Sequence, residues 1–249
     1  FFFLCFFFFN RDPPCVSSGR VAVLATVGEH LQLLLLYCKI EVRDAAKRAA
    51  KRVFGGKGAS AMEIRLLNEQ QAEQIYRSYM VQDFPPSELK PFASVQGLMR
   101  RGLYEPLALY EDGALAAYAW LVVLPGCPGA LLDYFAVLPE RRGGGVGTRA
   151  LQALAGHYAP SRQTLIIECE HPACAPDPAA ARRRVGFYLR AGARPTAMES
   201  LLFGVRYQIY ALPCGGAESD ADIRADLETL YRTMVPEPYY RGNVVFFGG

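Results

Sequence analysis

Apolar and polar residues alternate in two distinct periods after Met62. Segments with a period of two, or with continuous apolar residues, predict strands, and apolar residues three and four positions apart predict helices. Because predicted strands and helices follow one another along the chain, we expect an α/β (α+β) fold with one layer of sheet. Strands are predicted at 62–67, 105–110, 114–124, 131–138, 164–170, 200–205 and 207–212, and helices at 69–80, 87–101, 146–158, 178–190 and after Ser219.

Several predicted helices carry recognisable end signals. Asn68 with Gln71 three residues later is typical of a capping box at a helix start. Asp177 followed by Pro178 is typical of an N-cap with proline in the first helical position. Gly192 predicts the end of the same helix.

Residues 1–61 differ from the rest of the chain. They contain a nine-residue apolar block, an apolar stretch interrupted by Glu29 and a basic run, and they carry nine Lys+Arg against four Asp+Glu. We expect 1–61 to be an atypical extension outside the natural protein, whose start would be Met62. A membrane anchor is the alternative, although a charge inside the span costs roughly 2.5–3.5 kcal/mol. The predicted domain is 62–213, followed by a C-terminal helical extension at 214–249.

Composition excludes several classes of protein. The formal net charge is +3, and the Lys+Arg and Asp+Glu counts leave residues 62–249 at 18 − 20 = −2. This balance argues against nucleic acid as a partner. Seven cysteines form no C-x-x-C pair, and only three histidines occur. We therefore expect reduced thiols, no metal site and a cytoplasmic location, with no membrane partner for the main domain.

The segment from Leu131 to Leu151 contains the strongest chemical motif. An apolar run is followed by Pro139, two arginines, a turn with four glycines in five positions and a helical pattern. Glycines allow close approach to the backbone, and N–H groups that open onto a helix N-terminus bind anions. This pattern predicts a phosphate-binding turn.

Two nucleotide-binding motifs also contain a glycine-rich turn. A P-loop requires a lysine, and residues 140–150 contain none, which excludes that motif. Gly145-x-Gly147-x-x-Ala150 fits a dinucleotide fingerprint, with Glu168 near the distance of a ribose ligand. Against it, residues 139–142 separate the strand from the glycines, and the motif follows a hairpin instead of the first strand. An NAD-binding oxidoreductase stays open as the weaker alternative.

The string V-x-P-x-x-R-G-x-G-V-G-T from Val137 to Thr148 resembles the acyl-CoA-binding motif of GNAT-family N-acetyltransferases. The segment from Arg183 to Ala193, with Phe187-Tyr188, is similar to the R-x-x-x-F-Y-x-x-x-G-F segment of that family, although Ala193 replaces an aromatic residue. The resemblance covers about residues 62–213. It implies a mixed, mostly antiparallel sheet flanked by helices, and acetyl transfer from acetyl-CoA to a primary amine.

The resemblance also implies which residues act. Tyr188 stands at the family's tyrosine position and would be the general acid that protonates the leaving sulfur. Its ordinary alternative is a core aromatic residue paired with Phe187. The strand before the turn would contact the pantetheine arm, and the turn would hold the pyrophosphate. Acetyl-CoA-binding residues are therefore expected at Phe135, Ala136, Val137, Arg142, Gly143, Gly144, Gly145, Val146, Gly147 and Thr148.

The general base is harder to assign. Glu168 and Glu170 have the same parity on one predicted strand, so their side chains share a face. We prefer Glu170, nearer the strand end; a solvated carboxylate pair is the alternative. Cys169 between them points the other way and is expected to be a buried thiol. The roles of Asp133 and Tyr134 on the acceptor side stay open.

The acceptor itself is not encoded in any motif. The resemblance places substrate loops at 84–101 and 194–207, and it implies a small-molecule or peptide amine as partner. A regulatory domain that binds acyl-CoA without turnover is a second alternative, since a binding turn alone supports binding. The C-terminal extension could cover the acceptor pocket or form a homodimer contact.

Overall fold

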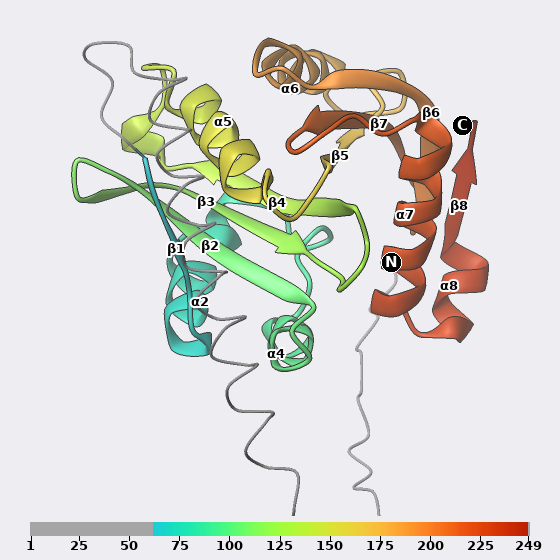
Figure 1. Cartoon of the computed structure of the whole chain (residues 1–249), viewed down its shortest axis with the longest axis horizontal. Coiled ribbons are helices and arrows are strands. Elements are labelled where there is room, and N and C mark those ends of the chain that lie inside the picture. The colour runs from blue at the N-terminus through green and yellow to red at the C-terminus, as the bar shows by residue number, and fades with distance from the viewer. Residues whose placement is uncertain (1–61, 249) are drawn as a thin grey trace, which may run out of the picture. The chain divides into compact units, whose positions relative to one another are not determined.

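The computed structural model describes residues 62–248, so the predictions for residues 1–61 lie outside the described part of the chain. The described strands form one eight-stranded sheet (Figure 1). The strands are β1 (Glu63–Leu66), β2 (Tyr104–Glu111), β3 (Ala114–Val122), β4 (Gly129–Val137), β5 (Thr164–Glu170), β6 (Arg194–Leu202), β7 (Val205–Pro213) and β8 (Val244–Phe247). The helices are α2 (Glu69–Ile75), the π-helix η1 (Tyr76–Met80), α3 (Val81–Asp83), α4 (Phe92–Arg100), the 3-10 helix η2 (Pro139–Arg141), α5 (Val146–Tyr158), α6 (Pro178–Arg190), α7 (Asp220–Met234) and α8 (Glu237–Asn243).

The strand order is β1-β2-β3-β4-β5-β7-β6-β8. Every neighbouring pair is antiparallel except β4 and β5, which run parallel. The predicted mixed, mostly antiparallel sheet is therefore confirmed. β4 and β5 divide it into an N-terminal part, β1 to β4, and a C-terminal part, β5 to β8.

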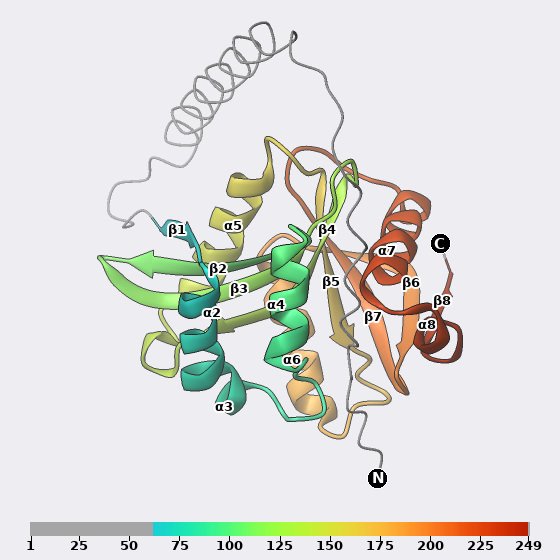
Figure 2. The same ribbon diagram turned by 90° about the horizontal axis from the view of Figure 1, so that it is seen from below.

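Helices cover both faces of the sheet, and each face has its own hydrophobic core. One core packs α2, α4 and α7 against side chains such as Trp120, Leu131 and Ile166, and Figure 2 views the molecule from that side. The other packs α5 and α6 against side chains such as Leu165 and Tyr210. Alternate residues of one strand thus enter different cores, as the predicted period of two requires. None of the helices between residues 62 and 248 is long and apolar enough to cross a membrane.

The predicted helix ends are confirmed where local signals define them. Asn68 and Gln71 form both hydrogen bonds of the capping box, at 2.9 and 3.1 Å. The Asp177 carboxylate accepts the N–H groups of Ala179 and Ala180 at the start of α6. Gly192 ends that helix with a φ of 105°, in the left-handed region that favours glycine.

Two predicted boundaries are wrong. Residues 87–90 are not helical, and α4 begins only at Phe92, because Pro91 disfavours helical geometry in the residue before it. The strand predicted at 200–205 is β6, which already begins at Arg194 and ends at Leu202. Phe203 and Gly204 form the turn with positive φ, so Val205 belongs to β7.

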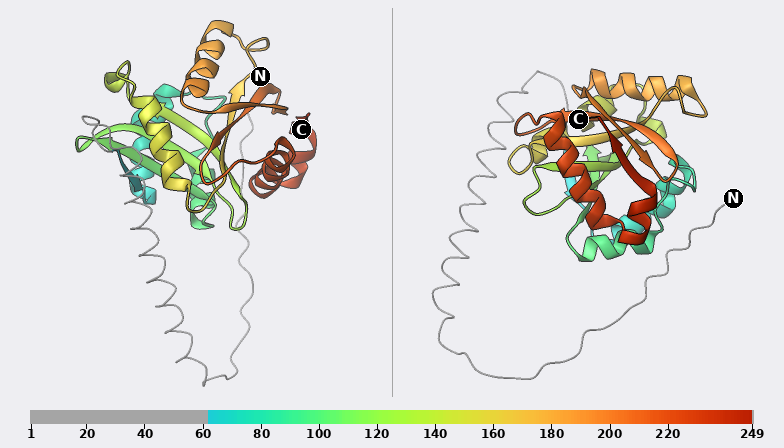
Figure 3. Two further views of the ribbon diagram at one scale, coloured as in Figure 1. Left: turned by 45° about the horizontal axis from the view of Figure 1, so that its top comes forward. Right: turned by 90° about the vertical axis from the view of Figure 1, so that its right-hand side faces the viewer.

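The C-terminal segment contains more than a helix. After α7 the chain forms the short helix α8 and then β8, which pairs with β6 as the last strand of the sheet. Figure 3 shows α7 and α8 beside β6 and β8. Alternate side chains of β8, Val244 and Phe246, enter the core that α7 covers. β8 was not among the strands predicted from the sequence.

Candidate active site

The sheet opens between β4 and β5. The two strands pair only at Gly129–Leu131 with Thr164–Ile166. Beyond these residues β4 stays paired with β3 up to Val137, and β5 stays paired with β7 up to Glu170. We call the unpaired inner edges, Leu132–Val137 and Ile167–Glu170, the β4–β5 divergence. Backbone groups of β4 along it, including those of Phe135–Val137, have no partner strand on that side.

A bulge interrupts β4 within the divergence. Trp120 of β3 pairs with Tyr134 and the next residue, Leu121, pairs with Leu132, so Asp133 is an extra residue in β4. A bulge redirects the side chain that it contains. Here the bulge places the side chains of Asp133 and Tyr134 against the residues that precede α4.

The glycine turn lies directly beyond the last residue of β4. Gly143 and Gly145 have φ values of 91° and 73°, which explains why glycine is needed at both positions. Gly145 is the N-cap of α5, and no side chain caps this helix start. A β-carbon at Gly143 or Gly144 would meet nothing within 4 Å among the described residues. The first N–H groups of α5 are therefore available to an anion such as a pyrophosphate.

Two arginines brace this turn. The Arg142 guanidinium donates to the Val137 carbonyl oxygen at 3.0 Å and to Asp83 at 2.9 Å. Arg149, one helical turn into α5, donates to the Gly144 carbonyl oxygen at 2.7 Å and pairs with Glu111. Arg142 thus joins the turn to β4 and α3, while its side chain stays about half exposed. Arg149 was not predicted, because its partner Glu111 is distant in sequence.

Tyr188 lies on the same face of the sheet as α5. It is 8% exposed and belongs to the core formed by α5, α6 and β5. Burial, together with the nearby Cys169 thiol, raises the pKa of Tyr188 above its ordinary value, so the hydroxyl keeps its proton. No residue of the described range forms a hydrogen bond with the Tyr188 hydroxyl. The Tyr188 ring therefore packs in the core, while its hydroxyl proton is not donated to any other described residue.

Glu168 and Glu170 enter the opposite face, as their common parity predicted. The Tyr231 hydroxyl of α7 donates to Glu168 Oε2 at 2.6 Å, whereas Oε1 is buried with no hydrogen-bond partner among the described residues. Burial raises the pKa of Glu168 to about 7, although the Tyr231 donor lowers it. Glu170 ends β5 and is half-buried. Cys169 is fully buried, as predicted, and burial raises the pKa of its thiol to about 12.

A polar cluster at the divergence joins Asp133 and Tyr134, which the sequence offered as candidates, to Lys90 and Tyr104, which it did not. Lys90 Nζ lies 2.6 and 2.9 Å from the two Asp133 oxygens, and the Tyr104 hydroxyl donates to Asp133 at 2.5 Å. The Tyr134 hydroxyl accepts the Lys90 N–H and donates to the Glu88 carbonyl oxygen. Burial lowers the pKa of Lys90, but the Asp133 charge and hydrogen bond, together with Tyr134 and Glu168, outweigh burial and raise that pKa. The one available signal was that Lys90 is the only lysine after Met62.

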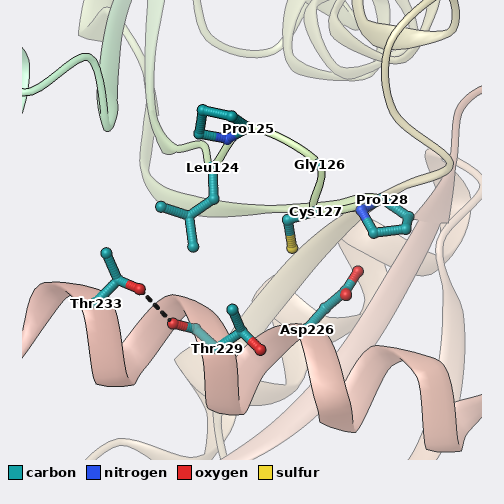
Figure 4. A pocket seen from close by; sticks show the side chains of 8 residues that line it. All are labelled: Leu124, Pro125, Gly126, Cys127, Pro128, Asp226, Thr229 and Thr233. Carbon is teal, nitrogen blue, oxygen red and sulfur yellow. Dashed lines mark hydrogen bonds between the residues drawn. The ribbon is translucent and has the colours of Figure 1, made fainter.

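The pocket in Figure 4 lies away from these residues. It is lined by the turn between β3 and β4 and by α7, at the end of β4 opposite the glycine turn. Asp226 in its wall already accepts the Gly129 N–H at 2.5 Å. No predicted site residue lines it. No group of three or more His, Cys, Asp or Glu side chains in the range 62–248 could hold a metal ion.

One solved structure supports the fold, and two others are similar at lower TM-scores. A GNAT-family protein from Bacteroides thetaiotaomicron superposes with a TM-score of 0.55 at 20% identity, covering 71% of this chain and 98% of its own. The ribosomal-protein-S18-alanine N-acetyltransferase from Escherichia coli matches with a TM-score of 0.47 at 24% identity, covering 64% of this chain and 97% of its own. Spermidine N-acetyltransferase from Vibrio cholerae gives 0.45 at 9% identity, covering 61% and 94%.

No curated protein matches the sequence significantly. The sequence model of the acetyltransferase (GNAT) family does match, over residues 70–192. This range includes the bulged strand, the glycine turn and Tyr188. The matched family consists of acetyltransferases. The match therefore favours neither of the two alternatives, an NAD-binding oxidoreductase or a binding domain without turnover. The chain belongs to the GNAT family and is an acetyl-CoA-dependent N-acetyltransferase.

Proposed function

We propose that the β4–β5 divergence is where this enzyme transfers the acetyl group to a primary amine, with the donor on the α5 side and the acceptor on the α7 side. The supporting observation is that donor-binding and acceptor-side groups lie on opposite faces of the sheet at the same divergence. An uncapped helix start and Tyr188 lie on one face, and Glu168, Asp133 and Lys90 lie on the other.

The residues present fit acetyl-CoA, which supplies the thioester that is cleaved. In the proposal, the N–H groups from Gly143 to Thr148 hold the pyrophosphate, and Arg142 keeps the turn in place. The backbone of Phe135–Val137 on the unpaired edge of β4 binds the pantetheine arm. Gly143 and Gly144 leave the surface of the turn open for this contact.

Proton transfer in the proposal uses one group on each face. Glu168 accepts a proton from the attacking amine, directly or through water, as the new C–N bond forms. Tyr188 donates its proton to the sulfur as the C–S bond breaks. We favour Glu168 over Glu170, because a carboxylate with a pKa of about 7 is a stronger base near neutral pH. Glu170 as the base stays a prediction that the same experiments test.

The acceptor side is negatively charged, which suits a cationic amine. Burial raises the pKa of the Tyr207 hydroxyl, and the charges of Glu168, Glu88 and Glu170 raise it further, so these three carboxylates gather around one tyrosine. Lys90 is already neutralised by Asp133. We infer a small-molecule or peptide amine that arrives protonated, releases one proton to water before it attacks, and passes the second proton to Glu168. A cytoplasmic location and a homodimer stay predictions.

A panel of amines tests this proposal. Amino acids, spermidine, aminoglycosides and peptides with free N-termini would be incubated with acetyl-CoA, with detection of the free thiol of CoA. The proposal predicts amine-dependent release that Glu168→Gln lowers about 100-fold and Glu170→Gln, on the same face of the same strand, leaves largely intact. The opposite ranking would assign the base to Glu170. Thermal stabilisation by NADH but not by acetyl-CoA would contradict the proposal altogether.

A further inference from the structure

We propose that Tyr231, in α7, is a positioning residue for Glu168, so that the C-terminal extension completes the acceptor side of the active site. The inference rests on the proposed role of Glu168. It goes beyond the family assignment, because the family match ends at residue 192 and α7 begins at Asp220.

The two carboxylate oxygens of Glu168 have different surroundings. Tyr231 Oη donates to Oε2 at 2.6 Å, a short charge-assisted hydrogen bond, while Oε1 has no partner in the described part of the chain. One oxygen is therefore fixed, and the other retains the capacity to accept a proton. Tyr231 is 8% exposed, and its ring packs edge-on against Phe246 of β8 at 5.8 Å, which restricts its rotation.

α7 is tied to both parts of the sheet, so its tyrosine is held in a defined place. Asp220 at the helix start accepts the Ala197 N–H of β6 at 2.7 Å and pairs with Arg194 at 2.6 Å. Asp226 accepts the Gly129 N–H at the beginning of β4. The helix thus spans the β4 and β5 sides of the opening from one face, and a shift of α7 would move the donor away from Glu168.

Tyr231 remains a donor across the whole working range of pH. Burial and the Glu168 charge raise the pKa of Tyr231 well above its ordinary value. Its hydrogen bond stabilises the charged form of Glu168 and so offsets part of the effect of burial. The groups that face Glu168 from the surrounding elements are Tyr231 of α7, Asp133 of β4, Ser200 of β6, Tyr207 of β7 and Lys90 before α4.

The deciding experiment measures the pKa of Glu168 directly and needs no acceptor. Protein labelled with carbon-13 in its glutamate carboxyl groups would be titrated by NMR, and Glu168→Gln would assign the resonance. Tyr231→Phe keeps the ring and removes the donor, so we expect the pKa of Glu168 to rise by about one unit. Tyr240→Phe is the matched control, because that buried tyrosine of neighbouring α8 makes no contact with Glu168, and it should leave the pKa unchanged.

An unchanged pKa of Glu168 in Tyr231→Phe would overturn the inference. If Tyr231→Phe fails to fold, 3-fluorotyrosine at position 231 tests the same contact, since its more acidic hydroxyl is a stronger donor and should lower the pKa of Glu168. The proposed role of Glu168 as the base is contradicted by a different result, namely wild-type turnover of the Glu168→Gln variant. With the fastest amine of the panel, the acid side of the kcat profile of Tyr231→Phe should move to higher pH with unchanged KM for acetyl-CoA. In the Glu168→Gln background, Tyr231→Phe should add no further loss.

Discussion

The Phe187 ring of α6 lies directly against Gly147 in the first turn of α5. A β-carbon at Gly147 would come within 2.9 Å of Phe187 Cε2 and 3.3 Å of Val137 Cγ2. The same ring stacks on Phe135 of β4, with centroids 6.1 Å apart. This contact joins the glycine turn, the last residues of β4 and the helix that carries Tyr188. The two sequence motifs are therefore one packed unit.

Gly147→Ala should disrupt this unit. The added methyl group must displace a ring that packs between β4 and α5, so we expect a loss of about 1–3 kcal/mol in the free energy of unfolding, with weaker acetyl-CoA binding. Gly156→Ala is the matched control, because it lies in the same helix with nothing within 4 Å of the added carbon. It should gain roughly 0.5–1 kcal/mol. Chemical denaturation of both variants checks this; equal effects would contradict the packing argument.

The sequence predicted features whose causes are local. Caps at Asn68, Asp177 and Ser219 and the left-handed Gly192 define helix ends within a few residues, and these ends were placed correctly. Parity also placed Glu168 and Glu170 on one face. Contacts between distant segments could not be predicted. The bulge at Asp133 changes the alternation within β4, and the Glu168–Tyr231 contact joins residues 63 positions apart.

Breaking the Lys90–Asp133 pair should destabilise the protein. Lys90→Met leaves the Asp133 carboxylate, whose side chain is 9% exposed, with only the Tyr104 donor. We expect a loss of about 2 kcal/mol in the free energy of unfolding, below the value for fully buried pairs because Lys90 is partly exposed. Adding Asp133→Asn to the Lys90→Met variant should restore part of the lost stability, because it removes the unpaired charge.

Arg100→Met provides the comparison for that experiment. The Arg100–Glu69 pair has similar distances but lies at the surface, with side chains 67% and 36% exposed. Because solvent screens this exposed pair, its loss should cost less than the loss of the Lys90–Asp133 pair. A Lys90→Met loss no larger than that of Arg100→Met would show that the pair at the divergence is not structurally important.

Glu168 should make stability depend on pH. Its pKa of about 7 in the folded protein lies above the ordinary value of 4.5, so the folded state binds the proton more tightly. Its contribution to stability is present below pH 4.5 and is lost as the pH rises to 7. Glu168→Gln stays neutral. It should match the wild type near pH 4.5 and exceed it by up to about 3 kcal/mol at pH 8, despite lower activity. Urea denaturation at both values measures this; equal differences at both would contradict the raised pKa.

Tyr188→Phe tests the central claim, that this enzyme transfers acetyl groups with Tyr188 as the proton donor. The variant keeps the ring in its buried site and removes the hydroxyl, which forms no hydrogen bond with other described residues. The decisive measurement is kcat with the best amine of the panel, alongside the acetyl-CoA dissociation constant from calorimetry. We expect a loss of about 100-fold in kcat, with the acetyl-CoA dissociation constant changed by no more than about twofold. Wild-type kcat in a folded Tyr188→Phe variant would contradict it.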